Sequence, residues 1–450
     1  MNLLRASDHD WRRRFANPLL RDPKVRLLAA VIFAGSMWFY VQHVLIPHQK
    51  ADAAAHGIPR GNLSDLYPRW LGARELLLHH RDPYSPEITR EIQAGYYGRP
   101  LDHARPFDPT DEQGFAYPVY VVFLLAPTIA LPFALVQVGF RWLLIMLTAV
   151  TVPLWLRVLR WRLSVLTTAS LIVLALGSFP VIQGIKLQQL SLLVHGLITV
   201  SVVFLAEGDF AAAGILLALA TIKPQLTLPL VAWLLVWALS DWRPRQRFVW
   251  GFFGTLAALF GLGELVLPGW IPRFYQAVLA YRRYNHGAAS ALDLLFTPSV
   301  GRALTVGILI ALVYAFWRQR RVSNRTPEFA WMIGLMLAAT ITIIPKEAPY
   351  NQVLLIAPIL LVLRCLPPLW HKSGIFRISL AIAALIILWP WLAAFAITVS
   401  AVILPATALQ RSWALPVYTS LTIPLAVFVM VAFVFKSLRW QPTDPKPDLH

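Results

Sequence analysis

Apolar runs recur almost without a break from Val25 to Phe435. Runs such as Leu27–Leu45, Leu163–Val181, Val249–Leu267 and Phe376–Phe395 approach the roughly 20 apolar residues that a helix needs to cross the hydrocarbon of a membrane. Short arginine clusters and polar, proline-marked loops separate the runs. The pattern predicts an all-α polytopic membrane protein, a helical bundle of about twelve transmembrane helices.

The distribution of charge orients this bundle. Basic residues before Leu27 place the N-terminus in the cytoplasm, and the polar segment Pro47–Phe115 then forms a large outer loop. The next apolar segment, 116–135, carries three prolines, and we interpret it as re-entrant or interfacial. Counting it as a full span would put the arginines of 157–162 outside, against the usual charge bias.

An alternative count treats 116–135 as a span and Phe210–Leu239 as one kinked helix, and it also reaches twelve. Our preferred count expects spans at Leu27–Ile46, Val136–Leu156, Leu163–Val181, Leu190–Leu205, Phe210–Ile222, Leu226–Leu239, Val249–Leu267, Leu304–Trp317, Phe329–Ile344, Val353–Leu366, Phe376–Phe395 and Ala414–Phe435. Residues 1–26 are then a basic cytoplasmic tail, 27–440 one transmembrane domain with outer loop 47–115, and 441–450 a second cytoplasmic tail. We expect the cytoplasmic (inner) membrane as the location.

Composition narrows the classes of function. Hydrophobic residues make up 58% of the chain and charged residues 14%, and the net charge is +18. The arginines lie between apolar runs, as expected for cytoplasmic loops, so we expect no nucleic-acid partner. The single cysteine, Cys365, excludes an intrachain disulfide framework. Because no nucleotide-binding glycine motif occurs, the sequence argues against ATP-driven transport by this chain alone.

Asp65 is the first candidate for chemistry, soon after the first span. Apolar residues at helical spacing follow it and predict an amphipathic helix on the outer membrane surface: Leu66, Trp70, Ala73 and Leu77. Pro68 fits only the first turn of such a helix, which places Ser64 or Asp65 at the N-cap. Asp65 is therefore either a helix cap or a general base whose pKa burial raises, while Arg69 keeps it ionised. Asp82, in the turn Arg81–Pro86, is the second-choice carboxylate.

Three further turns carry cations or amides on the outer side. Lys223-Pro224-Gln225 places a lysine at the N-terminus of a helix, an arrangement that binds phosphate, although the lysine could instead extend to the membrane interface. The turn Gly184–Gln189 offers Lys186, Gln188 and Gln189 for hydroxyls or phosphate oxygens, or for cross-linking helices.

The third turn, Pro345–Asn351, offers Lys346, Tyr350 and Asn351. The run Arg282–His286, which includes the candidates Arg283 and His286, adds positive charge to the outer side, where the usual charge bias places few basic residues. Such a departure indicates either an anionic ligand or an anchor for lipid headgroups. No spacing of residues resembles a zinc site, and the sequence says nothing about a divalent ion.

Several short motifs together resemble a known family. They are Ser64-Asp65-Leu66-Tyr67, Asp82-Pro83-Tyr84, Phe115-Ala116-Tyr117-Pro118, Gly184-Ile185-Lys186-Leu187-Gln188-Gln189 and Thr221-Ile222-Lys223-Pro224. In order and spacing the chain resembles glycosyltransferase family 87, the polyprenyl-phosphate-mannose-dependent mannosyltransferases of the GT-C class. The resemblance implies a GT-C fold, a polyprenyl-phosphate sugar donor, and an acidic first-loop residue as base, which corresponds to Asp65.

We therefore expect an inverting transfer of a hexose from a polyprenyl-phosphate donor to a lipid or glycan acceptor on the outer side, without a cofactor. The alternatives are a transporter or flippase of a lipid-linked sugar and a non-catalytic scaffold of envelope assembly. The candidate catalytic residue is Asp65, and Lys223, Lys186 and Arg283 are the candidates for the donor phosphate. The candidate substrate-binding residues are Arg69, Asp82, Tyr84, Tyr117, Gln188, Gln189, Gln225, His286, Lys346, Tyr350 and Asn351.

Overall fold

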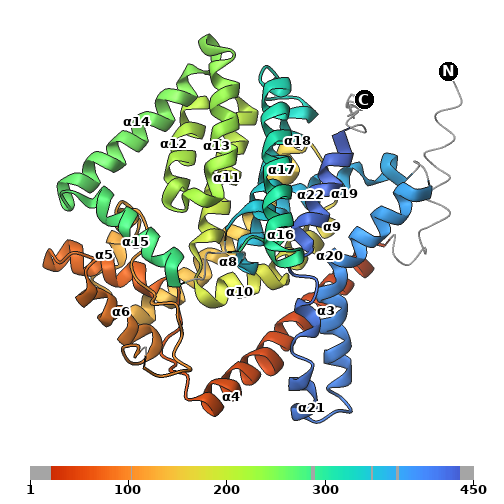
Figure 1. Cartoon of the computed structure of the whole chain (residues 1–450). Helices are drawn as coiled ribbons and strands as arrows, with labels where there is room; N and C mark the ends of the chain where they lie inside the picture. The colour runs from red at the N-terminus through yellow and green to blue at the C-terminus, as the bar shows by residue number, and fades with distance from the viewer. Residues whose placement is uncertain (1–21, 103, 285–288, 346–347, 371–373, 436–450) are drawn as a thin grey trace, which may run out of the picture.

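The computed structural model of the chain describes residues 22–102, 104–284, 289–345, 348–370 and 374–435, and within these ranges every regular element is a helix (Figure 1). The longer helices are α3 (Pro23–Tyr40), α8 (Phe133–Val158), α11 (Leu190–Glu207), α13 (Pro224–Leu239), α14 (Trp242–Val266), α15 (Trp270–Tyr284), α17 (Pro298–Gln319), α18 (Pro327–Ile343), α19 (Ile356–Trp370) and α20 (Gly374–Ser400). The shorter helices are α4 (Ile46–His56), α5 (Tyr67–His79), α6 (Pro86–Tyr97), α7 (Val121–Leu125), α9 (Val165–Leu176), α10 (Phe179–Leu187), α12 (Phe210–Leu219), α16 (Ala291–Leu295), α21 (Ala406–Arg411) and α22 (Ile423–Val434).

Seven helical stretches of the described chain are long and apolar enough to cross a membrane. An eighth is α9 with α10, if this pair, bent by 59°, forms one broken span. Four shorter apolar helices complete the bundle: Phe210–Ile222, Pro224–Leu239, Pro327–Ile343 and Ile423–Val434. The chain is therefore an all-helical, polytopic membrane protein.

The first long helix starts and ends with clear local signals. Asp22 caps it by accepting a hydrogen bond from the backbone N–H of Lys24 at 2.9 Å, and Pro23 occupies the first turn. A π-helical turn at Val41–Leu45 joins α3 to α4, so that the stretch from Pro23 to His56 contains 34 residues. Gly57 ends it in the left-handed conformation, with φ 65°.

The proline-rich segment after the outer loop forms no long helix. It contains the five-residue helix α7, a 3-10 turn at Ala126–Thr128, and then Pro132 at the start of α8. Val121, Val122 and Leu125 are buried, and the segment packs against α5. Prolines interrupt the helix here because each one removes a backbone donor and restricts the residue before it. The segment therefore has the short, broken form that its prolines indicate.

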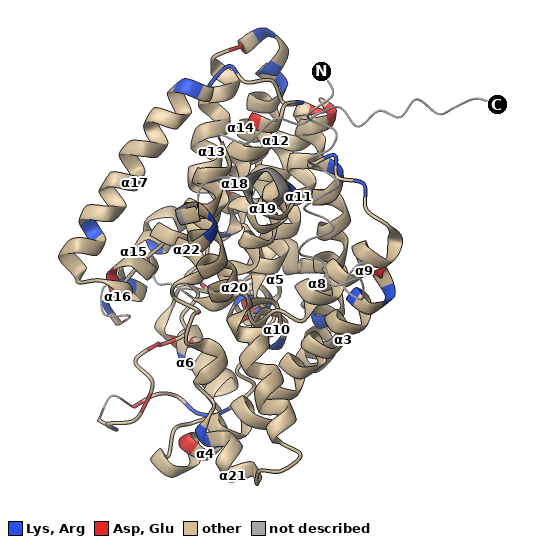
Figure 2. Cartoon of the chain, turned by 90° about the vertical axis from the view of Figure 1, so that its right-hand side faces the viewer, with Lys and Arg blue, Asp and Glu red and all other residues tan. Residues whose placement is uncertain are grey.

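Three basic connections meet at one end of the bundle. The Arg245 guanidinium, near the start of α14, donates to the carbonyl of Trp237 at 2.7 Å and to that of Val322 at 3.1 Å. On a neighbouring connection, Arg157 forms an ion pair with Glu207 at 2.7 Å. Figure 2 shows most charged ribbon at the ends of the helices, while the middle of the bundle is mostly uncharged. Because α13 runs from Pro224 to Leu239 and Lys223 directly precedes it, Lys223 lies at the opposite end from these connections.

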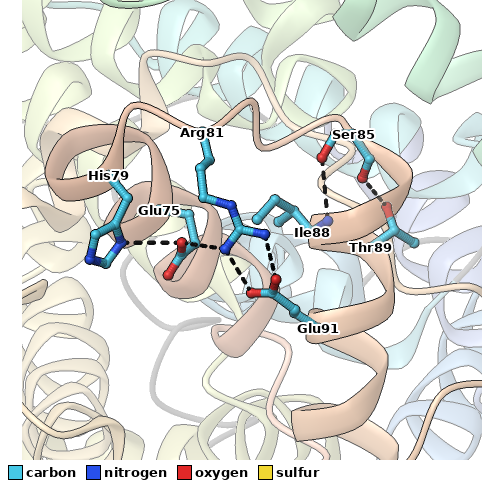
Figure 3. Close-up of polar contacts among 7 residues, drawn as sticks. All are labelled: Glu75, His79, Arg81, Ser85, Ile88, Thr89 and Glu91. Carbon is cyan, nitrogen blue, oxygen red and sulfur yellow. Dashed lines mark hydrogen bonds and ion pairs between the residues drawn. The ribbon is translucent and has the colours of Figure 1, made fainter.

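The long loop after α4 folds into a compact unit beside that opposite end. Arg81 lies between Glu75 of α5 and Glu91 of α6, and its guanidinium bonds both carboxylates (Figure 3). Ser85 caps α6 through the backbone N–H of Ile88. Figure 1 shows α5, α6 and α15 gathered on one side of the bundle, and the Arg273–Asp82 ion pair, at 2.9 Å, connects α15 to the α5–α6 turn. The loop is thus a structured layer that fixes the positions of its side chains.

The crossing of α12 and α14 depends on glycine. A Cβ added to Gly214 of α12 would lie 2.3 Å from the carbonyl oxygen of Phe248, and one added to Gly251 of α14 would lie 2.5 Å from that of Ala211. Both of these neighbours are backbone atoms, which cannot move aside without shifting a helix. Small residues at such crossings let two helices pack backbone against backbone in a membrane.

Candidate active site

Asp65 lies in the loop just before α5, and its backbone and side chain are both bound. Its N–H donates to the carbonyl of Leu187 at 2.8 Å, which attaches the loop to the end of α10. The carboxylate accepts a hydrogen bond from the hydroxyl of Tyr96 at 3.0 Å and a second one from the side-chain amide of Gln189. The expectation of a helix cap is wrong: α5 begins at Tyr67 with Leu66 at the N-cap position, and no side chain caps it.

Gln189 connects this carboxylate to a lysine. Its Nε2 donates to Asp65, and its Oε1 accepts a hydrogen bond from the Lys223 ammonium at 2.9 Å. Gln189 occupies the N-cap position of α11, and Lys223 occupies that of α13. Both are buried; Lys223 is only 5% exposed. Two helix N-termini therefore meet at the acid, the amide and the cation.

Ser191 and the segment before α19 close the lysine side of the site. Lys223 donates to the Ser191 hydroxyl at 2.7 Å, and that hydroxyl donates to the Asn351 side-chain oxygen at 2.7 Å. The Tyr350 ring lies 5.2 Å from the Lys223 nitrogen, within the range of a cation–π contact. Tyr350 and Asn351 both belong to the 3-10 helix Pro349–Leu355. The predicted residues Lys223, Tyr350 and Asn351 are thus neighbours.

Arg69 brings a second cation to the same acid. It lies one turn after Asp65, and its guanidinium donates to the Asp65 carbonyl at 2.8 Å. The guanidinium also lies 4.2 Å from the centre of the Tyr117 ring. Its Nε is buried and has no hydrogen-bond partner among the described residues. A buried N–H without an acceptor destabilises the folded state unless a ligand or a water accepts its hydrogen bond. Arg69 is therefore suited to bind an anion.

Burial raises the pKa of the Asp65 carboxyl above its usual value. Arg69, the hydrogen bonds from Tyr96 and Gln189, and Lys223 act in the opposite direction by stabilising the ionised form. Burial also raises the pKa of Tyr96, and the Asp65 charge reinforces the effect, so the tyrosine remains a hydrogen-bond donor. An elevated carboxyl pKa with strong donors around it is typical of a group that takes up a proton during a reaction.

Gln188 stabilises the turn between α10 and α11. It ends α10 in the left-handed conformation, with φ 50°, and it is fully buried. Its side-chain oxygen accepts from the Ser64 hydroxyl at 2.7 Å and from the Gln137 amide at 3.1 Å. Its own amide donates to the carbonyl of Ile185 at 2.7 Å. These bonds fix the turn between α10 and α11, which carries Gln189.

Several predicted site residues lie elsewhere. The Lys186 ammonium points to α4 and contacts the side-chain oxygen of Gln49 at 3.3 Å, since it lies on another face of α10 than the turn that reaches Asp65. The Asp82 carboxylate accepts hydrogen bonds from the Arg273 guanidinium and from the backbone N–H of Tyr84, so it connects α15 to the loop. Gln225, the second residue of α13, is exposed, whereas Lys223 is buried.

Arg283 is exposed on α15, and no hydrogen bond or ion pair of the described chain joins it to Asp65. His286 and Lys346 lie outside the described residues. Tyr84 supports the site indirectly, because its hydroxyl donates to the carbonyl of Tyr117 at 2.6 Å. The predicted set thus divides into a contacting group around Asp65 and Lys223 and a group that lies apart from it.

Sequence reasoning missed three residues of the site: Tyr96, Ser191 and Tyr281. Tyr96 lies on α6, far from any motif, and only the packing of α6 brings its hydroxyl to Asp65. Ser191 follows the Gln189 motif by two residues, and its place in the first turn of α11 was the available signal. The Tyr281 side chain of α15 lies close enough to Arg69 and Asp65 to act on their charges. The described residues contain no group of three or more histidine, cysteine or acidic side chains placed to hold a metal ion.

Comparison with known proteins gives one match. The model of glycosyltransferase family 87 matches residues 115–345, about half of the chain. This segment includes Gln189, Ser191 and Lys223, whereas Asp65 and Arg69 precede it. No curated protein and no solved structure matched the chain.

Proposed function

The chain belongs to glycosyltransferase family 87, and from this membership we propose that it transfers a hexose, such as mannose, from a polyprenyl-phosphate donor to a lipid or glycan acceptor with inversion at the anomeric carbon. It is a membrane glycosyltransferase by family and by its apolar helices. The bridge from Asp65 through Gln189 to Lys223 is the observation that carries the finer proposal.

In the proposed reaction Asp65 is the general base. The acceptor hydroxyl gives its proton to the carboxylate, and its oxygen forms a bond to the anomeric carbon of the sugar. The bond from that carbon to the phosphate oxygen breaks, and the polyprenyl phosphate leaves with the electron pair. One displacement inverts the anomeric centre, so a single carboxylate is sufficient.

Two cations support departure of the phosphate. Lys223 is held by Gln189 and Ser191 at an end of the site where the N-termini of α11 and α13 also meet. The Arg69 guanidinium bonds the backbone carbonyl of Asp65, and its buried Nε has no hydrogen-bond partner among the described residues. Fixed cations and helix N-termini stabilise the negative charge that develops on the leaving group, and they need little reorganisation because they are already in place. We expect membrane lipids around the bundle to be partners, and we expect the reaction to need no cofactor.

We place the reaction on the outer side of the cytoplasmic membrane. Twelve spans in a single transmembrane domain, with both termini in the cytoplasm, put the arginine-rich connections inside and the loop that carries Asp65 outside. The position of the Arg245 connections at the opposite end of α13 from Lys223 supports this orientation. The four short apolar helices supply the spans beyond those that are long enough on their own.

The test is a transfer assay on purified protein with radiolabelled polyprenyl-phosphate hexose and an envelope lipid extract, without an ion gradient. Wild type should form a new glycoside, whereas a flippase or a scaffold should form none. Asp65→Asn should lower the rate by about 10²–10⁴ and still bind the donor, because the amide keeps the shape but accepts no proton. Glu87→Gln, an exposed acid on α6, is the matched control and should keep the wild-type rate. Undiminished transfer by Asp65→Asn would rule out this base.

A further inference from the structure

Lys186, which lies away from Asp65, belongs to a second group of cations. Its ammonium donates to the side-chain oxygen of Gln49 at 3.3 Å, and the Arg60 guanidinium donates to the backbone carbonyl of the same Gln49 at 3.0 Å. Lys50 is the next residue along α4. The last turn of α10, which is distant in the chain, and the loop just after α4 therefore both bring positive charge to one glutamine of α4.

No acid within the described ranges of the chain neutralises this group. Among the described residues, none of the three cations has a carboxylate within ion-pair distance, and the nearest acid along α4, Asp52, pairs with His56 at 3.3 Å. The charges that act on Lys186 come from Arg60 and Lys50, and both repel it. Lys50 and Arg60 are exposed, and Lys186 is half-buried. Cations that repel one another and have no carboxylate partner favour the binding of an anion, and the exposure of Lys50 and Arg60 leaves them accessible to one.

The height of the group along the first long helix indicates where that anion lies. If the apolar run enters the hydrocarbon at Leu27, a core about 30 Å thick at about 1.5 Å per residue ends near Ile46. Gln49 and Lys50 then follow within one turn, roughly 5 Å beyond the hydrocarbon. That is the level of lipid phosphates, on the outer side in the orientation proposed above.

The group is separate from the active site but adjacent to it. The carbonyl of Leu187 bonds the backbone N–H of Asp65, while the neighbouring Lys186 side chain points to α4 instead. The turn between α10 and α11 thus carries Gln189 toward the carboxylate and Lys186 away from it.

We infer that Lys50, Arg60 and Lys186 bind the phosphate of a lipid in the outer leaflet, at a site distinct from the one around Asp65. Phosphate matches the group because Arg60 and Lys186 both meet at Gln49, whose backbone and side-chain oxygens accept from them, and the charge of the adjacent Lys50 acts on Lys186. An anionic phospholipid and a polyprenyl phosphate present the same chemistry, and the experiment separates them. The inference does not depend on the reaction proposed for Asp65.

The experiment measures lipids bound to the intact purified protein by native mass spectrometry in detergent. Four probes are added separately: phosphatidylglycerol, polyprenyl phosphate, the zwitterionic phosphatidylcholine and inorganic phosphate. Wild type is compared with Arg60→Gln/Lys186→Gln, and with the charge-matched control Arg90→Gln/Arg302→Gln, which removes two exposed arginines from α6 and α17. Lys223→Met is included to remove the cation of the active site.

The double variant of the cluster should bind the preferred anionic lipid about 25-fold more weakly, because each cation near an anionic headgroup contributes about fivefold. The arginine control should bind it as wild type does, and Lys223→Met should leave the binding of phosphatidylglycerol unchanged. Preference for phosphatidylglycerol assigns a bulk membrane lipid, and preference for polyprenyl phosphate assigns a substrate-type lipid. Equal lipid binding by wild type and the double variant overturns the inference, as does a site that holds inorganic phosphate but neither lipid. Neither result affects the transfer assay on Asp65.

Discussion

Asp65 and Lys223, which lie far apart in the chain, are joined by the single side chain of Gln189. The amide nitrogen of Gln189 donates to the Asp65 carboxylate, and its amide oxygen accepts a hydrogen bond from the Lys223 ammonium at 2.9 Å. The two charges fix the orientation of this amide, because a flipped amide would turn its oxygen to the carboxylate and its N–H groups to the ammonium. The base and the cation of the proposed reaction therefore hold each other in place through one residue.

Replacing Gln189 tests that link. Gln189→Met keeps the length of the side chain but offers neither donor nor acceptor, so Asp65 loses a hydrogen bond that stabilises its ionised form. Its pKa, already raised by burial, should rise further. The rate of transfer falls as the base becomes protonated, so the acid limb of the pH–rate profile should move to higher pH. Gln246→Met, on α14 at the basic end of the bundle, should keep the wild-type profile; an unmoved limb in Gln189→Met would contradict the link.

Tyr96 and Tyr97 form a matched pair for the same question. Tyr96 donates its hydroxyl to the Asp65 carboxylate, whereas the adjacent Tyr97 donates to the backbone carbonyl of Asp111 at 2.6 Å. Tyr96→Phe should shift the acid limb upward by about one to two pH units, since a hydrogen bond to a charged group contributes about 1.5–3 kcal/mol and one pKa unit is about 1.4 kcal/mol. Tyr97→Phe should leave the limb in place. The same shift in both variants would point to a general disturbance of α6.

Lys223 should act on the leaving group. Lys223→Met removes the charge and keeps the apolar stem, so we expect a fall of about 10²–10³ in kcat, with a smaller change in KM for the donor. The acid limb should also move upward, because the positive charge of Lys223 lowers the pKa of Asp65. Lys24→Met, an exposed lysine at the start of α3, is the control. A change confined to KM would show that Lys223 only binds the donor.

The sequence predicted the elements of the fold because their causes are local. The length of the apolar runs predicted the long helices. Prolines at 118, 127 and 132 predicted the segment that forms only short helical turns. The nearness of Asp65 to Lys223 was also predictable, since both lie at polar turns that the charge pattern places on one side. Family resemblance pointed to the same two residues.

The direction of side chains was much harder to predict. Lys186 and Gln189 lie in one motif, but the left-handed Gln188 between them turns the chain, so one points to α4 and the other to Asp65. Gln225 follows Lys223 by two residues, which on a helix places it on another face. Tyr96 has no motif, because only the packing of α6 against the loop brings it to the acid. These positions depend on tertiary contacts, which no local pattern encodes.

Gly251 and Gly254 of α14 test how the bundle is held together. A methyl group on Gly251 would lie 2.5 Å from the carbonyl oxygen of Ala211, whereas one on Gly254 would have no atom within 4 Å. Gly251→Ala should therefore destabilise the protein by about 1–3 kcal/mol, the usual cost of overpacking, because α12 and α14 must separate. Gly254→Ala should be neutral or slightly stabilising, since alanine favours the helix more than glycine does. Thermal unfolding of the two variants in the same detergent measures the difference. An unfolding temperature for Gly251→Ala equal to or above that of Gly254→Ala would mean that the two helices do not pack backbone against backbone at this crossing.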